Sequence, residues 1–285
     1  MSGRLLLTAL LFTLSTNSSH GAVPFTVILD PGHGGDDTGA ITTQHGRRIY
    51  EKDLTLAIAR QTQRYLRARG IPTVLTRTDD HFVPLDQRTK SANQSAARTQ
   101  SAVFVSIHAN SSDESRSSGS EIYVFNAATN DASRRLADFE NGRSTHDPGR
   151  RASLRTQNHG TLDLIMSDLA TTANYAESID LACAVETAVA AGTKNRAQPP
   201  MRDRGVRQAL FYVLMDSHVP GILFEPGFLS NAQDLSRLTS PVYQARLARG
   251  LGDGIIKWQR AQGWRPTTVS GVAKKRPQHC HIVKN

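Results

Sequence analysis

The chain has 285 residues, of which 38% are hydrophobic and 21% are charged, and its formal net charge is +9. This composition excludes a disordered or fibrous polymer and indicates either one large globular domain or two small ones.

The N-terminus has the pattern of an export signal. Arg4 precedes a largely apolar run from Leu5 to Leu14, and small residues lead from there to Ala22. A charged start, a short apolar stretch and a small-residue exit describe a secretory signal peptide. The run is too short to span a bilayer, and no later stretch approaches that length. We therefore expect a signal peptide over residues 1–21 and a periplasmic or secreted protein that does not span the membrane.

Three short apolar runs are each followed at once by a histidine or a glutamate. Val27–Leu29 leads into a Gly-rich loop that holds His33, residues 103–107 precede His108, and residues 221–224 precede Glu225. Such runs predict buried strands, and ligands in α/β proteins bind just beyond the carboxyl ends of strands. We expect these side chains to lie on one rim of a sheet.

Glu51 opens an amphipathic segment and could join the same rim. Two histidines and a carboxylate are the protein ligands of many hydrolytic zinc sites, and a further carboxylate can act as the base. Each residue also has a simpler explanation. A lone histidine in a Gly-rich turn is often only a polar side chain, and an acid in the first turn of a helix favours the helix dipole.

The remaining pattern predicts one α/β domain over residues 22–264. We expect helices at 51–69, 84–99, 131–141, 162–169, 173–191 and 241–262, and further strands at 73–76, 119–125 and 210–214. The regular alternation stops over residues 127–208, which we interpret as a helical insertion that contains a basic loop at 143–160.

The C-terminal residues 265–285 carry five Lys or Arg and no acid, which predicts a basic, flexible tail. A basic exported protein could favour anionic wall polymers, membrane surfaces or nucleic acid, but a solvated tail is the simpler explanation, and we expect no nucleic-acid partner. The only two cysteines are Cys183 and Cys280. A single bridge could form between them, although the helical setting of Cys183 favours a small core residue.

Six stretches in register resemble the zinc-dependent N-acetylmuramoyl-L-alanine amidases of the amidase-3 type. They are Leu29–Gly35, Glu51–Leu54, Thr76–Asp79, Leu85–Thr89, Ser106–Asn110 and Glu225–Asn231. The resemblance covers about residues 25–262 and implies a three-layer domain with a mixed central sheet flanked by helices. It also implies that His33, Glu51 and His108 bind Zn²⁺ and that Glu225 is the catalytic acid/base. Pro226 departs from the small polar residue that relatives commonly carry there.

By the same resemblance, the substrate is peptidoglycan, and the bond cut is the amide between N-acetylmuramic acid and L-alanine. Two alternatives use the same residues differently. One is a zinc carboxypeptidase-like peptidase acting on ordinary peptides, and the other is a non-catalytic wall-binding protein that keeps the fold.

The helix expected at 131–141 places Ala132, Leu136, Phe139 and Glu140 on one face. Burial of that face would carry the Glu140 carboxylate into the protein, where it needs a cation, and the open zinc position could supply one. Alternatively, Glu140 lies at the margin of the face and reaches solvent. The resemblance favours the first: division-associated relatives carry a blocking helix with a glutamate in a similar Glu-Asn context. A partner protein of the LytM type displaces that helix, so we expect autoinhibition with Glu140 as an added zinc ligand.

Overall fold

The computed structural model of the chain describes residues 25–99, 101–142, 161–194, 201–262 and 280–283, with side chains only from residue 174 onward in the third segment. The expected signal peptide, the basic loop at 143–160 and most of the expected tail lie outside these residues. The strands are β1 Phe25–Pro31, β2 Ile41–Gln44, β3 Arg47–Tyr50, β4 Thr73–Leu75, β5 Ser101–Ile107, β6 Ser120–Phe125, β7 Asp203–Ala209 and β8 Gly221–Glu225. The helices are α1 Glu51–Arg67, α2 Leu85–Thr99, α3 Asp131–Glu140, α5 Thr161–Gly192, α6 Tyr212–Met215, α7 Ala232–Leu238 and α8 Pro241–Ala261.

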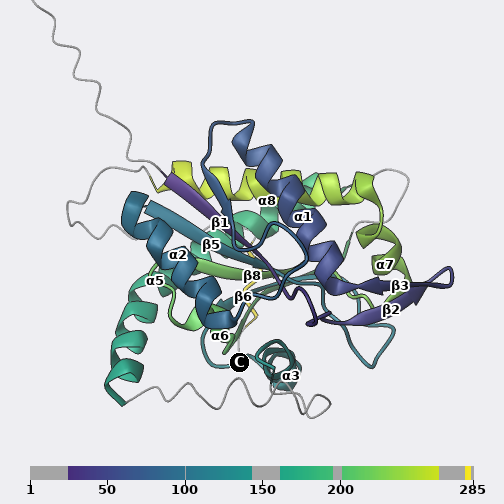
Figure 1. Cartoon of the computed structure of the whole chain (residues 1–285), viewed down its shortest axis with the longest axis horizontal. Coiled ribbons are helices and arrows are strands. Elements are labelled where there is room, and N and C mark those ends of the chain that lie inside the picture. The colour runs from purple at the N-terminus through teal and green to yellow at the C-terminus, as the bar shows by residue number, and fades with distance from the viewer. Residues whose placement is uncertain (1–24, 100, 143–160, 195–200, 263–279, 284–285) are drawn as a thin grey trace, which may run out of the picture.

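A six-stranded mixed sheet forms the centre of the molecule (Figure 1). Its strand order is β4-β1-β5-β8-β6-β7. The first four strands are parallel, β6 pairs antiparallel with β8, and β7 pairs parallel with β6. The amino ends of β6 and β7 therefore lie at the same edge of the sheet as the carboxyl ends of β1, β5 and β8.

Alternating side chains of each strand pack into two separate hydrophobic clusters, because successive residues of a strand point to opposite faces. On β1, Val27 and Leu29 pack with α1, α5 and α8, whereas Ile28 packs with α2, α3 and α6. The expected three-layer arrangement with a mixed sheet is confirmed.

Several elements differ from the expectation. The predicted strand at 210–214 is wrong: β7 ends at Ala209, and Tyr212–Met215 is the short helix α6. The two helices expected at 162–169 and 173–191 are one continuous helix, α5. A small hairpin of β2 and β3 was not predicted. It turns through His45 and Gly46, both with positive φ, and delivers the chain directly to Glu51.

The expectation of a flexible tail is wrong for residues 280–283. Cys280 forms a disulfide with Cys183, and Ile282 pairs with Val206 on the edge strand β7. Cys183 is also fully buried, so it is both a core residue and half of a bridge. None of the helices in the described part of the chain is long and apolar enough to cross a membrane.

Candidate metal centre

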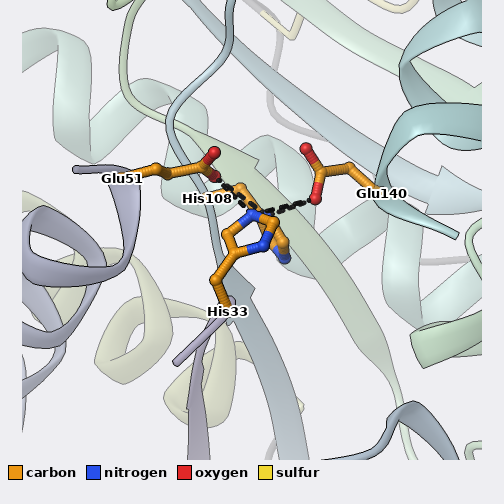
Figure 2. A group of neighbouring side chains, drawn as sticks. All are labelled: His33, Glu51, His108 and Glu140. Atoms are coloured by element: carbon orange, nitrogen blue, oxygen red, sulfur yellow. Dashed lines mark hydrogen bonds and ion pairs between the residues drawn. The ribbon is translucent and has the colours of Figure 1, made fainter. Parts of the chain in front are cut away.

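Four ionisable side chains meet at the carboxyl edge of the sheet. His33 comes from the loop after β1, Glu51 from the first residue of α1, and His108 from the residue after β5. Glu140, the last residue of α3, completes the group from the opposite side (Figure 2). All four are buried, and one ligand atom from each lies within 4.8 Å of the others. The structure therefore brings together the three predicted metal ligands and the predicted blocking residue.

The imidazole nitrogens face the carboxylates at short distances. His33 Nε2 lies 3.0 Å from Glu51 Oε1 and 3.2 Å from Glu140 Oε2. His108 Nδ1 lies 3.1 Å from Glu51 Oε1 and 2.8 Å from Glu140 Oε2. A tetrahedral zinc ion with bonds of about 2.0–2.1 Å would hold its ligand atoms about 3.3 Å apart. The donor set and its spacing fit zinc.

The other ring nitrogen of His33 is held from outside the cluster. His33 Nδ1 lies 3.0 Å from Asp37 Oδ1, and a carboxylate can only accept, so Nδ1 donates and Nε2 is the nitrogen that faces the cluster. A carboxylate that orients a metal-binding imidazole in this way also raises its basicity. Asp37 was not predicted, although its place four residues after His33 in the Gly-rich loop was visible in the sequence.

Glu51 is fixed by two backbone donors. Ala40 N donates to Oε2 at 2.8 Å, and Ala109 N donates to Oε1 at 2.9 Å. These bonds hold the carboxylate at the start of α1 and aim it at both histidines. The first-turn position suits the helix dipole as expected, and it also serves the cluster.

The cluster requires positive charge. Burial alone would lower the pKa of His33 and of His108, but the Glu51 and Glu140 carboxylates reverse this effect. They raise the pKa of His33 well above its usual range and that of His108 to about 10. Two buried carboxylates thus hold protons on the imidazoles wherever no other cation takes their place, which is the charge balance a divalent metal satisfies.

Glycines allow this crowding. A Cβ on Gly32 would lie 2.5 Å from the His108 ring, and a Cβ on Gly39 would lie 2.5 Å from His33 and 2.6 Å from Glu51 Oε2. Gly39 also has a φ of +64°, which favours glycine. A side chain at Gly32 would displace His108 from the cluster, and one at Gly39 would displace His33 and Glu51.

Two buried arginines shape the loop that carries His33. Arg77 donates to the carbonyl oxygens of Pro31 and Gly32 at 3.0 and 2.8 Å. Arg88 donates to those of Pro31 and His33 at 2.8 and 2.9 Å, and it pairs with Asp30 at 3.0 Å. Both arginines lie in stretches that resemble the amidase-3 pattern, but nothing in those stretches indicates that they bind backbone carbonyls.

Helix α3 carries Glu140 into the cluster. Asn130 caps its start by accepting from Ser133 N at 2.9 Å. Asn141, after its end, donates to Leu210 O and accepts from Tyr212 N, both at 2.7 Å. The buried residues are Ser133, Ala137 and Glu140. The predicted face was therefore wrong in part, because Ala132 is exposed, but it was right to bury Glu140.

Glu225 lies at the end of β8 and is completely buried. Neither of its oxygens hydrogen-bonds to another group in the part of the chain that the structure describes. Burial, opposed by His108 and strengthened by the Glu140 and Glu51 carboxylates, raises the pKa of Glu225 well above its usual range. It is thus a carboxyl group beside the cluster, outside the four ligand atoms and with no structural hydrogen bond to maintain.

Comparison with known proteins gives this geometry a context. The profile of the amidase-3 family, described as N-acetylmuramoyl-L-alanine amidase, matches residues 27–257. The chain belongs to the amidase-3 family. Its sequence is 30% identical over 234 residues to the N-acetylmuramoyl-L-alanine amidase AmiA of Escherichia coli, and this alignment covers 81% of the chain and 75% of AmiA.

The amidase LytC of Bacillus subtilis is 32% identical over 82% of the chain, but the chain spans only 36% of LytC. Among solved structures, an N-acetylmuramoyl-L-alanine amidase from Clostridium difficile superimposes with a TM-score of 0.60 at 28% identity, covering 85% of the chain and 100% of that structure. The fold and the assignment as an amidase-3 enzyme are thereby confirmed, and the family's reaction is amide hydrolysis in peptidoglycan.

Proposed function

We propose that this amidase-3 enzyme is a zinc-dependent N-acetylmuramoyl-L-alanine amidase that cuts the amide between N-acetylmuramic acid and the L-alanine of the stem peptide. The observation that carries the zinc assignment is the convergence of His33, Glu51 and His108, with ligand atoms about as far apart as a tetrahedral zinc ion requires. Their charge balance, which calls for a cation between two carboxylates, supports it independently.

In this proposal His33 Nε2, His108 Nδ1 and Glu51 hold the metal. Zinc, when bound, supplies a Lewis acid that lowers the pKa of water towards about 7 and polarises the scissile carbonyl. Glu225 accepts the proton of the attacking water and returns it to the amine nitrogen of L-alanine as that bond breaks. Its freedom from structural hydrogen bonds suits a group that must take and give a proton.

Replacement of Glu225 by glutamine tests this division of roles. Glu225→Gln should bind one zinc per chain, as the wild type does, and should lose at least about 100-fold in hydrolysis, because an amide cannot accept the proton. His33→Ala should lose zinc and hydrolysis together. Metal analysis of both proteins, with mass spectrometry of digested peptidoglycan, gives the answer. Near-normal turnover by Glu225→Gln, or full activity of wild type after exhaustive chelation, would contradict the proposal.

The same digestion separates the two alternatives. A carboxypeptidase-like enzyme would shorten the stem peptide, whereas an amidase detaches the intact stem from the sugar. A non-catalytic wall-binding protein would change neither, and the filled ligand and base positions argue against it.

We further propose that α3 inhibits the enzyme, with Glu140 as a fourth zinc ligand. Glu140 Oε2 lies as close to the two imidazole nitrogens as Glu51 Oε1 does, so it occupies the position that water and substrate need. A partner that pulls α3 away would activate the enzyme, and a LytM-type protein that contacts residues 143–160 is our candidate.

Glu140→Ala should therefore hydrolyse purified peptidoglycan faster than wild type at equal zinc occupancy and without any partner. Asp138→Ala is the matched control, since it removes an acid from the same helix outside the cluster. Equal or lower rates for Glu140→Ala would show that α3 does not block the site.

The proposed substrate lies outside the cytoplasm, which agrees with the signal peptide expected over residues 1–21. We propose export to the periplasm or beyond, and a role in cell division by analogy with the autoinhibited relatives. Release of a fusion reporter from the cytoplasm by residues 1–21 would test the export signal alone.

A further inference from the structure

A second charged group lies beside Glu225 on the same face of the sheet. Glu121, on β6, is 4% exposed and pairs across the strands with Glu225. Its carboxylate accepts from Asn110 Nδ2 at 3.0 Å and from the Tyr123 hydroxyl at 2.7 Å. These two bonds already satisfy much of a buried carboxylate, and the proposed reaction uses neither of them.

Two arginines from the edge strand β7 face the same carboxylate. Arg204 Nε donates to Glu121 Oε1 at 2.5 Å, and Arg207 Nε lies 3.3 Å from the same oxygen. One guanidinium suffices to neutralise one carboxylate, so the second leaves an excess of positive charge. This positive charge lies near Glu225, which borders the cluster of His33, Glu51, His108 and Glu140.

Arg204 is placed to bind something more. Its side chain is 21% exposed, and its guanidinium lies over the Phe228 ring at 5.2 Å. Only Nε points to Glu121; its two terminal nitrogens hydrogen-bond to no other residue that the structure describes. A guanidinium held by Nε and by an aromatic ring presents its outer edge in a fixed orientation, which suits a carboxylate. Arg207, 13% exposed, adds charge beside it.

The position fits the substrate of the proposed reaction. Glu225, on β8, lies opposite Glu121, and Arg204 contacts Glu121 from β7 on the other side of β6. Arg204 and Glu225 therefore lie two strand spacings of about 4.8 Å apart, with Glu121 between them. A carboxylate on the second residue of a peptide lies at most about 7 Å from the amide nitrogen of the first. The stem peptide leaves with L-alanine first, so an acid on the next residue can reach Arg204 while Glu225 serves the leaving nitrogen.

We propose that Arg204, supported by Arg207, binds the carboxylate of the stem-peptide residue that follows L-alanine and so selects acidic stem peptides. This inference rests on the proposed amidase function. The simpler possibility is that both arginines serve only to neutralise Glu121, and the experiment must separate the two.

The test compares two soluble substrates, N-acetylmuramoyl dipeptides whose second residue carries either a carboxylate or its carboxamide. The reference protein is the zinc-loaded full chain with Glu140→Ala, because the proposed block by α3 would mask turnover in the wild type. The reference protein should hydrolyse the carboxylate substrate with a kcat/KM about 10- to 100-fold higher than the carboxamide substrate. Arg204→Gln should lose this preference, falling by a similar factor on the carboxylate substrate and changing little on the carboxamide. If the role of Arg204 is purely structural, the substitution should lower kcat/KM for both substrates by the same factor.

Arg202→Gln is the matched control. It removes the same charge as Arg204→Gln, and Arg202 is exposed and lies two residues before Arg204. In the Glu140→Ala background it should keep the preference of the reference protein. Equal use of both substrates by the reference protein would overturn the subsite while leaving the amidase assignment intact. Equal losses by Arg204→Gln on both substrates would also overturn the subsite. Hydrolysis of neither substrate by the reference protein would remove the proposed function together with the subsite.

Discussion

At the scale of single residues, Arg88 determines much of where His33 lies. Its guanidinium donates to Val83 O, Pro31 O and His33 O and also pairs with Asp30, all between 2.8 and 3.0 Å. Burial alone would raise the pKa of Asp30, but Arg88, aided by the Thr76 and Ser106 hydroxyls, lowers it. The loop that carries His33 is therefore held by an ion pair and by hydrogen bonds from Arg88, which lies in a different part of the chain.

Arg88→Lys should loosen that loop. Lysine keeps the charge but lacks the planar fork, so at least two carbonyls lose a donor in a buried setting. We expect a loss of about 1–3 kcal/mol in the free energy of unfolding and roughly 10- to 100-fold weaker zinc binding. Urea unfolding and competition with a zinc chelator measure the two effects. Arg98→Lys, an exposed change on the same helix, is the control; an Arg88 variant that behaves like it would disprove the role.

The sequence could predict His33, Glu51, His108 and Glu225 because each follows a strand or opens a helix, and strand ends converge in an α/β sheet. Arg77 and Arg88 could not be recognised in the same way. Their bonds go to backbone carbonyls distant in sequence, and an arginine at the start of a polar helix gives no sign that it is buried. Arg204 and Arg207 of β7 were not predicted either, because their partner, Glu121, is distant in sequence.

At the scale of the elements, α5 and α8 approach so closely that side chains are excluded from the contact. A Cβ on Gly254 would lie 2.5 Å from Val185 Cα, and one on Gly250 would lie 2.8 Å from Val189 Cα. The two glycines are four residues apart and lie on one face of α8. They cost helix propensity but allow two backbones to touch over the core.

Gly254→Ala should therefore destabilise the protein, although alanine favours a helix by about 1 kcal/mol. The added methyl group meets backbone atoms that cannot turn away, so we expect a net loss of about 1–3 kcal/mol. Gly192→Ala is the matched control. A Cβ at Gly192 would lie 3.4 Å from its nearest neighbour, Gly250 Cα, so this change should leave the free energy of unfolding nearly unchanged. Thermal unfolding of both variants decides the matter; a rise in Tm for Gly254→Ala would refute the steric argument.

The type of an element could be predicted where the hydrophobic periodicity was strong. The prediction failed where pairing with a neighbouring strand determines the structure. Residues 210–214 are apolar enough for a strand, yet Tyr212–Met215 form the short helix α6, and Leu210 before it is 49% exposed. The strand is the polar stretch Asp203–Ala209, of which only Val206 and Ala209 contribute buried apolar side chains. It is a strand because β6 offers a free edge, and that is a property of the assembled sheet.

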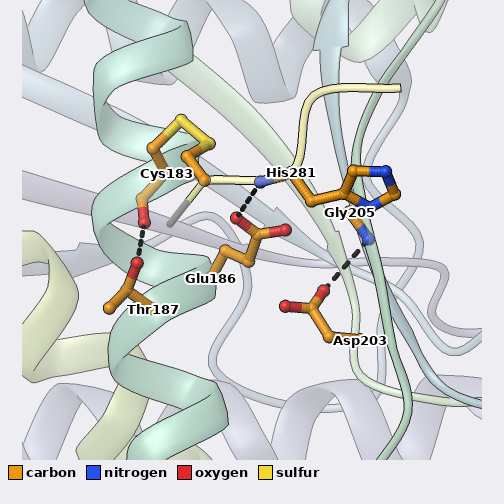
Figure 3. The surroundings of a disulfide bond; sticks show 7 residues. Cys183, Glu186, Thr187, Asp203, Gly205 and His281 are labelled. Atoms are coloured by element: carbon orange, nitrogen blue, oxygen red, sulfur yellow. Dashed lines mark hydrogen bonds between the residues drawn. A yellow bond between two sulfur atoms is a disulfide. The ribbon is translucent and has the colours of Figure 1, made fainter. Parts of the chain in front are cut away.

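At the scale of the whole molecule, residues 280–283 are attached to the domain by a disulfide and by pairing with β7. The disulfide joins Cys280 to Cys183 across 97 residues (Figure 3). Val206 N donates to His281 O at 2.8 Å, so the segment pairs with the outer edge of β7. A bridge over about 100 residues stabilises a fold by roughly 2–5 kcal/mol. A single pair of cysteines permitted this bridge, but nothing in the sequence placed Cys280 against α5.

Two acidic side chains that repel each other, Glu186 and Asp203, lie next to this disulfide-bonded segment. Glu186 lies on α5 three residues after Cys183, and its Oε2 accepts from His281 N at 3.3 Å while Asp203 lies close by (Figure 3). Burial, strengthened by the Asp203 carboxylate, raises the pKa of Glu186 to about 8. In an unfolded chain the same group titrates near about 4.3. Between these values the folded protein keeps a proton that the unfolded chain releases, so this group makes the free energy of unfolding fall as pH rises.

Glu186→Gln should remove that fall. Glutamine has the same shape and still accepts from His281 N, but it does not titrate. The variant should therefore be close to wild type at pH 5 and gain on it towards pH 8, by about 1–3 kcal/mol in the free energy of unfolding. Urea unfolding at several pH values, with the disulfide kept oxidised, measures the difference, and Glu177→Gln on the exposed side of α5 is the control. If the difference in free energy of unfolding between the variant and wild type stays constant with pH, or favours wild type as pH rises, the pKa of Glu186 is not raised in the folded protein.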